Sequence, residues 1–225
     1  MRTICRCSLL ICCILLFTRP LPVHAIPAIT CHCFTNRSFD VAHPTAADAY
    51  FLAMTQNSFF AVVFNVDKKL IVLKKQQGTS SDDLWVAYWV ASKSAASPES
   101  LLNSRLARDS WTNVIVPMQL PPKMLGVRFY YYLTSNLPSE RLSQVVVDEL
   151  LIKCKLLNES DVTVLRKDGA TNQEIIIAAV IAAKMNQHAM QLFREVKSGT
   201  KSWGSLLSAA KIDAKNIQHE ISTLF

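Results

Sequence analysis

Apolar residues in this chain are gathered in blocks that predict helices. Two blocks, residues 84–91 and 175–183, are apolar at every position, which is typical of helices that are buried on all sides. Each helix would span about 15 residues, which is shorter than the roughly 20 residues that a bilayer span needs. No strand-like alternation competes with these blocks, so the pattern predicts an all-α fold built around two central helices.

The same start signal precedes both central helices. Ser80 with Asp83, and Thr171 with Glu174, have the spacing of a capping box. In such a box the hydroxyl accepts a hydrogen bond from the third helical N–H, and the carboxylate accepts one from the N–H of the capping residue itself. A glycine lies two residues before each box and can end the preceding helix in a left-handed conformation. Both segments therefore predict a helix, a short turn and a second helix.

The two matching start signals belong to a longer internal repeat. Residues 72–125 recur as residues 164–217. Matched residues such as Gly78 and Gly169 are 91 positions apart, and the second copy gains one residue shortly before Ser110-Trp111 is matched by Ser202-Trp203. We expect two homologous multi-helix repeats packed into one compact helical domain. The predicted organisation is a signal peptide (1–25), an N-terminal segment (26–44), repeat 1 (45–125), a connector (126–135) and repeat 2 (136–225).

Other helices are predicted around the two central ones. Residues 46–64 have the apolar load of a packed helix, and Ser97-Pro98 is a favourable helix start. Residues 69–73 fit either a helix end or a short extended segment, because periodicity does not separate the two. Residues 126–137 are expected to form the tail of the helix that starts near Pro122.

The N-terminus has the pattern of a secretory signal. Basic Arg2 and Arg6 precede an apolar run at residues 8–17, Arg19 interrupts the run, and small residues favour cleavage after Ala25. The alternative, an uncleaved membrane anchor, is disfavoured by the shortness of the run. Cleavage would lower the formal charge of +7 by three, to +4. We expect a periplasmic or secreted protein with no integral membrane span in its mature chain.

Three cysteines would remain after cleavage: Cys31, Cys33 and Cys154. In an oxidising compartment the simplest expectation is a disulfide between Cys154 and one member of the other pair, which leaves one thiol over. Cys31, His32 and Cys33 are also soft ligands that could begin a zinc, copper or haem site. The C-x-C spacing is tighter than the usual C-x₂-C of zinc sites. Residues that could complete such a site are Asp40, His43, Asp48 and Cys154.

Other catalytic and binding motifs are missing from the sequence. It contains no G-x-S-x-G element, phosphate-binding loop, dinucleotide fingerprint or H-E-x-x-H pair. The spacing of apolar residues over 199–221 fits a helix-turn-helix, but the predicted signal peptide directs the chain away from DNA. The predicted second helix also offers only Lys215 as a cation. We therefore expect no nucleic-acid partner.

Several short motifs carry a resemblance to known proteins. They are Cys31-His32-Cys33-Phe34, Asn57-Ser58-Phe59, residues 74–85 and Ser202-Trp203-Gly204. Together they resemble a family of small uncharacterised secreted all-helical proteins of Gram-negative bacteria. The resemblance implies export and a helical fold, and it brings no activity. The first repeat departs from the pattern, because Thr112 occupies the position of the glycine.

Two functional hypotheses follow from the sequence. The first is an exported non-catalytic protein that binds another protein or an envelope component. The alternative is a metal- or cofactor-dependent protein, an enzyme or a carrier, whose site is built on Cys31, His32 and Cys33.

Overall fold

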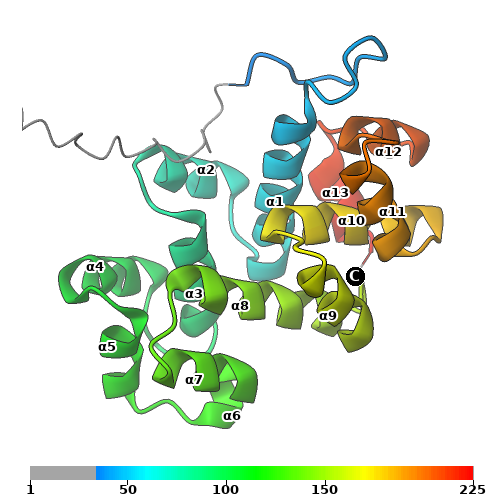
Figure 1. Cartoon of the computed structure of the whole chain (residues 1–225). Helices are drawn as coiled ribbons and strands as arrows, with labels where there is room; N and C mark the ends of the chain where they lie inside the picture. Colours follow the sequence, from blue (N-terminus) through cyan, green and yellow to red (C-terminus); the bar gives the residue numbers. More distant parts are fainter. Residues whose placement is uncertain (1–33, 225) are drawn as a thin grey trace, which may run out of the picture. The chain divides into compact units, whose positions relative to one another are not determined.

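The computed structural model describes residues 34–224, and every regular element in that range is helical (Figure 1). The predicted all-α class is therefore confirmed. The elements are α1 (Asp48–Phe64), α2 (Lys68–Gln76), α3 (Ser81–Ala91), α4 (Pro98–Arg108), α5 (Trp111–Ile115), the 3₁₀ helix η1 (Val116–Met118), α6 (Pro122–Leu125), α7 (Val127–Thr134), α8 (Ser139–Lys153), α9 (Glu159–Lys167), α10 (Asn172–Met185), α11 (Ala189–Lys197), α12 (Trp203–Ala209) and α13 (Ile217–Ser222).

Both predicted capping boxes begin a helix, but only the second forms both of its hydrogen bonds. At α10, Thr171 and Glu174 form both hydrogen bonds of the capping box. At α3, the Ser80 hydroxyl accepts from the backbone N–H of Asp83, but the predicted return bond is not formed. The Asp83 carboxylate instead accepts a hydrogen bond from the indole N–H of Trp111 at 2.7 Å. The Ser80 hydroxyl donates to the other carboxylate oxygen of Asp83 at 2.9 Å, so this carboxylate makes one local and one tertiary contact.

The structure decides one boundary that the sequence left open and corrects another. Residues 69–73 belong to the helix α2 and not to an extended segment. Residues 126–137 are not the tail of the preceding helix, because the chain breaks at Gly126 between α6 and α7. Gly126 has φ of +92°, and a Cβ there would lie 2.7 Å from Oε1 of Glu149. Both facts favour glycine at this position.

The helix starts follow the register of the predicted repeat. Helices α8, α9, α10 and α11 each begin 91 residues after α1, α2, α3 and α4, respectively, and α12 begins 92 residues after α5. The four pairs begin at residues 48 and 139, 68 and 159, 81 and 172, and 98 and 189. The order and spacing of the helices are thus compatible with a duplication, and the homology of the two halves stays a prediction.

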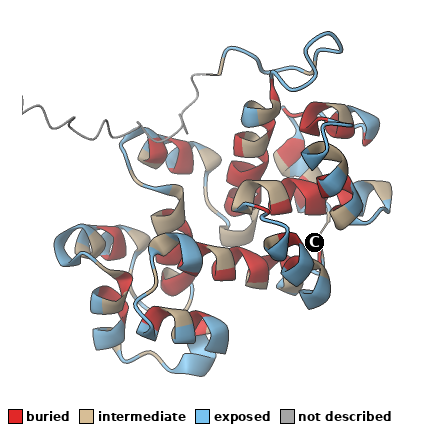
Figure 2. Cartoon of the chain, in the orientation of Figure 1, coloured by how far each residue is buried: buried red, intermediate tan, exposed pale blue. Residues whose placement is uncertain are grey.

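The two halves pack against each other through their first and third helices. In the described part of the chain, α3 packs against α8 and α1 packs against α10 (Figure 1). The first helix of each half therefore lies on the third helix of the other. Buried residues run through these four helices, and their buried apolar side chains belong to one cluster (Figure 2). A single apolar core results, to which both halves contribute.

None of the helices in the described range is long and apolar enough to cross a membrane.

Candidate functional site

Helix α1 carries four consecutive buried polar residues in its middle, Thr55, Gln56, Asn57 and Ser58. Buried polar groups need partners, because an unpaired group loses its hydrogen bonds to water. All four have one. The hydrogen bonds run from Thr55 Oγ1 to the Phe51 carbonyl (2.7 Å), from Gln173 Nε2 to Gln56 Oε1 (3.2 Å), from Lys75 Nζ to Asn57 Oδ1 (2.6 Å) and from Lys68 Nζ to Ser58 Oγ (3.4 Å).

A second polar network crosses from α8 to α3. Arg166 pairs with Asp148 at 2.7 Å and also donates to Asn172 Oδ1 at 2.6 Å. The Asn172 amide in turn donates to the Ser143 hydroxyl at 3.0 Å. That hydroxyl lies 2.5 Å from Oδ1 of Asp82 and donates to it. A continuous chain of polar contacts thus joins the end of α9, the middle of α8 and the starts of α10 and α3.

The two networks contain matching pairs. Lys75 on α2 binds Asn57 on α1, and Arg166 on α9 binds Asp148 on α8. The second pair lies 91 residues after the first at both positions. In each half, a cation near the end of the second helix is therefore bound to a buried polar residue of the first helix.

Burial sets the acidity of the carboxylates in the second network. Burial raises the pKa of Asp148, and the charge of Arg166 opposes that rise. Burial likewise raises the pKa of Asp82, while its hydrogen bond with Ser143 lowers it and the nearby Glu140 carboxylate raises it further. The start of α3 thus holds a carboxyl group whose negative charge is less favourable than in water.

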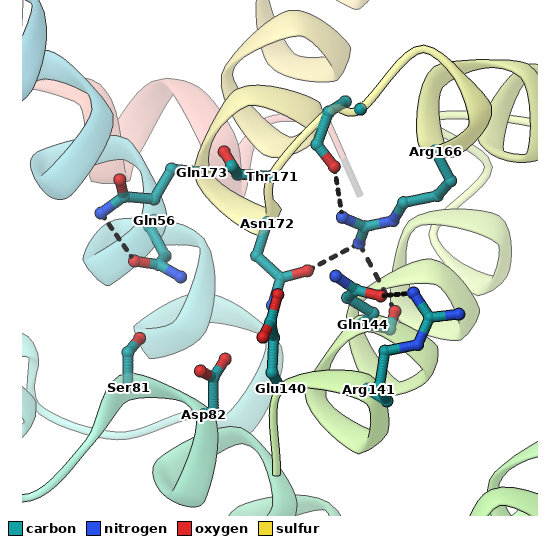
Figure 3. A pocket seen from close by; sticks show the side chains of 12 residues that line it. Gln56, Ser81, Asp82, Glu140, Arg141, Gln144, Arg166, Thr171, Asn172 and Gln173 are labelled. Carbon is teal, nitrogen blue, oxygen red and sulfur yellow. Dashed lines mark hydrogen bonds between the residues drawn. The ribbon is translucent and has the colours of Figure 1, made fainter. Parts of the chain in front are cut away.

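A cleft of about 450 Å³ opens beside this second network (Figure 3). It lies between the starts of α3, α8 and α10, the end of α9 and the middle of α1. Its volume is within the range of small-molecule sites. The residues that line it are Gln56, Ser81, Asp82, Glu140, Arg141, Gln144, Arg166, Gly169, Ala170, Thr171, Asn172 and Gln173.

The residues of the predicted metal site and disulfide fall mostly outside the structure. Cys31, His32 and Cys33 precede the described residues, so the metal site and the disulfide both stay predictions. Cys154 follows the last residue of α8, is half-buried and forms no disulfide with another described residue. Burial raises the pKa of its thiol. No group of three or more potential His, Cys, Asp or Glu ligands is found among residues 34–224.

The other candidate ligands have different surroundings. Asp40 and His43 form an exposed pair, with 3.1 Å between Oδ2 and Nδ1. Asp48 accepts hydrogen bonds from the backbone N–H groups of Trp203 and Gly204, at 3.2 and 2.9 Å. Asp48 therefore holds the start of α12 against α1, which is a structural role.

Comparisons of the chain with descriptions of protein families, with curated proteins and with solved structures found no match. The resemblance to secreted proteins of Gram-negative bacteria stays a prediction, and the cleft must be interpreted from its own chemistry.

The polar networks and the cleft were not predicted from the sequence. One signal was present, because residues 55–58 place four polar residues inside an otherwise apolar block. Some partners in the two networks are far apart along the chain: Gln173 is 117 residues from Gln56, and Ser143 is 61 residues from Asp82. Local patterns contain no information about such pairs.

Lys75 gives the folded protein a testable pH dependence. Burial disfavours its ammonium and lowers its pKa to about 8 from 10.5, against the opposing attraction of Asp82. Between these values the unfolded chain binds more protons than the folded chain, so stability rises with pH. We expect the free energy of unfolding to rise by about 1 kcal/mol from roughly pH 7.5 to about pH 9 through this residue.

Urea denaturation of the wild type and of Lys75→Gln across this pH interval measures the effect. Glutamine keeps a hydrogen-bond donor for Asn57 but does not titrate. As the pH rises, the free energy of unfolding of the wild type should therefore increase relative to that of Lys75→Gln. A constant difference would contradict a depressed pKa for Lys75.

Proposed function

We propose that this chain is an exported, non-catalytic helical protein that associates with an anionic envelope surface. The contact is made by the α6–α7 face, which we define as Val116, Met124, Val127 and Tyr131. The observation that carries the proposal is the exposure of these apolar side chains on a stretch of chain that contains no acidic residue.

The apolar side chains of the α6–α7 face are exposed to solvent and do not pack into the core. Val127 is 70% exposed and Tyr131 is 67% exposed, while Phe129 and Leu133 on the same helix are buried. Val127 and Tyr131 are four residues apart, so they lie on one side of α7. Met124 in α6 and Val116 in η1 are also exposed. This face supplies the apolar element of an interfacial contact.

The charge along this stretch of chain favours an anionic partner, although the Glu149 carboxylate of α8 lies against Gly126 and interacts with Arg128. No aspartate or glutamate occurs between Asp109 and Glu140, whereas the stretch contains Lys123 and Arg128. Both cations are at the surface, although Arg128 also lies 3.4 Å from Asp148. Each cation near an anionic membrane contributes about 1 kcal/mol, and tyrosine favours the interface between lipid and water. An anionic lipid surface therefore fits this face better than an acidic or neutral protein.

Export is proposed from the N-terminal segment, residues 1–25, which lies outside the described residues. A periplasmic or secreted location would give the mature chain access to a membrane surface, and its formal charge of +4 after cleavage would favour that approach. The alternative function, a metal or cofactor site built on Cys31, His32 and Cys33, has no supporting contact among the described residues and stays a prediction.

A second apolar pair offers a matched comparison. Leu70 and Leu73 on α2 are 42% and 49% exposed, and Lys69 lies beside them. This pair has an acidic neighbour, since Asp67 caps the start of α2, and the other three lysines of α2 are engaged: Lys68 with Ser58, Lys74 with Glu99 and Lys75 with Asn57. We therefore expect α2 to contribute less than the α6–α7 face.

Cosedimentation of the mature chain with vesicles tests the proposal. We expect binding to phosphatidylglycerol-containing vesicles and at least tenfold weaker binding to pure phosphatidylcholine vesicles. The difference arises because each cation loses about 1 kcal/mol of attraction on a neutral surface. The Val127→Ser/Tyr131→Ser variant should bind about tenfold more weakly, because it removes the apolar contact. Exposed Val41, 83% accessible and outside this face, gives the control Val41→Ser, which should bind like the wild type.

Circular dichroism would confirm that the variants remain folded. Equal binding to both kinds of vesicle would contradict the role of charge. Loss of binding in Leu70→Ser/Leu73→Ser, with Val127→Ser/Tyr131→Ser unchanged, would move the contact to α2 and overturn the proposal.

A further inference from the structure

The cleft beside α3, α8 and α10 separates positive from negative side chains. Figure 3 shows the carboxylates of Asp82 and Glu140 toward one side and the guanidinium of Arg141 toward the other. Asn172 and Gln144 lie between these two sides. The cleft therefore presents a cation-binding end, an anion-binding end and amide groups that can donate and accept hydrogen bonds between them.

At the positive end, Arg141 is the group available to a ligand. Its guanidinium donates to Gln144 Oε1 at 2.9 Å, and a guanidinium has five N–H donors. Arg166 lines the same cleft, but it already binds Asp148, Asn172 and the carbonyl of Ala170. Arg141 is exposed and can meet a carboxylate with two parallel hydrogen bonds.

At the negative end, the surroundings favour a ligand cation. Asp82 is close enough to Glu140 for the two charges to repel, and burial adds to the cost of ionising Asp82. The nearby Lys75 is engaged with Asn57. Ser81 also lines the cleft, and its buried hydroxyl has no hydrogen-bond partner within residues 34–224. An ammonium group placed between Asp82 and Glu140 would relieve the repulsion.

We propose that the cleft binds a small dipolar molecule, a free amino acid or a dipeptide. The ligand's ammonium lies against Asp82 and Glu140, and its carboxylate is held by Arg141. A simple anion would meet two carboxylates, and a simple cation would bring no anionic group to the guanidinium of Arg141. The cleft volume of about 450 Å³ accommodates molecules of this size. This site is separate from the α6–α7 face and does not depend on membrane binding.

Isothermal titration calorimetry of the full mature chain tests the proposal with glycine and glycylglycine as probes. We expect at least one of them to bind, and the stronger of the two identifies the amino acid or the dipeptide as the source of the ligand. For that probe, acetylation of the amine or amidation of the carboxylate should each weaken binding about tenfold or more, because each removes a charge-assisted contact. Sucrose represents the competing class of neutral polyols and should not bind.

Variants of the two exposed charged residues connect the effect to the cleft. Arg141→Gln should abolish the preference for the free carboxylate over the amide, and Glu140→Gln should reduce the preference for the free amine. Matched controls are Arg194→Gln, whose arginine pairs with Asp168, and Glu159→Gln in the first turn of α9. Both residues lie outside the lining of the cleft and should leave binding unchanged.

Absence of binding by both probes would overturn the proposal, as would binding of sucrose in their place. Binding that is unaffected by Arg141→Gln and Glu140→Gln would also overturn it, because the ligand would then occupy another site. Vesicle binding of the same variants should equal that of the wild type, so failure here is distinguishable from failure of the envelope proposal.

Discussion

Replacing Asp148 by alanine is expected to lower the free energy of unfolding by about 3–5 kcal/mol. Asp148 is 1% exposed and accepts hydrogen bonds from Arg166, whose guanidinium is also largely buried. Its removal leaves that guanidinium without its counter-ion, and an uncompensated buried charge is strongly destabilising. Urea denaturation monitored by circular dichroism at neutral pH measures the change.

Asp168→Ala is the matched control. Asp168 also pairs with an arginine, Arg194, at 3.0 Å, but the two side chains are 33% and 63% exposed, far more than those of Asp148 and Arg166. Exposed ion pairs contribute about 0–1 kcal/mol. If the two aspartate variants lose equal stability, the Asp148 pair does not have the structural role that its burial indicates.

Replacing Trp85 by alanine is expected to destabilise the protein by about 3–5 kcal/mol. Trp85 is fully buried, and its ring packs against Phe59, Phe60 and Phe64, with the Phe60 centroid 4.5 Å away. Alanine would leave a large cavity where the helices α1 and α3 meet, and rigid cores close such cavities only in part. Thermal and urea unfolding measure the loss.

A phenylalanine series separates packing from hydrogen bonding. The indole N–H of Trp85 has no acceptor among the described residues, whereas that of Trp89 donates to the carbonyl of Leu125 at 2.9 Å. Trp85→Phe removes a buried unsatisfied donor and should therefore cost less than Trp89→Phe, by about 1 kcal/mol. The reverse order would show that a hydrogen bond to Trp85 exists in solution.

Local signals in the sequence were sufficient for much of the fold. The blocks at residues 84–91 and 175–183 form buried helices because every one of their faces is apolar, and α4 begins at the predicted Ser97-Pro98 start. The break at Gly126 was missed, because the apolar residues on both sides of it fit one continuous helix. Only the contact with Glu149, which is remote in sequence, shows why the chain turns there.

The candidate site was much less predictable. Sequence reasoning selected Cys31, His32 and Cys33, because reactive residue types in close spacing are visible in one dimension. The cleft instead collects ordinary polar residues, such as Asp82, Arg141 and Asn172, from separate helices. Each of them is unremarkable in its own segment, since polar residues are common near helix starts. Their proximity follows from tertiary packing, which the sequence patterns did not resolve.

The packing of each half's first helix on the other half's third helix has a consequence for biosynthesis. Helix α1 packs on α10, which is synthesised long after it, so the first half leaves the ribosome with apolar surface that its own residues do not cover. Contacts between such distant segments slow folding and lengthen the exposure of aggregation-prone surface. We therefore expect the nascent chain to depend on a chaperone until its last helices have emerged, and a chain truncated at the connector to aggregate.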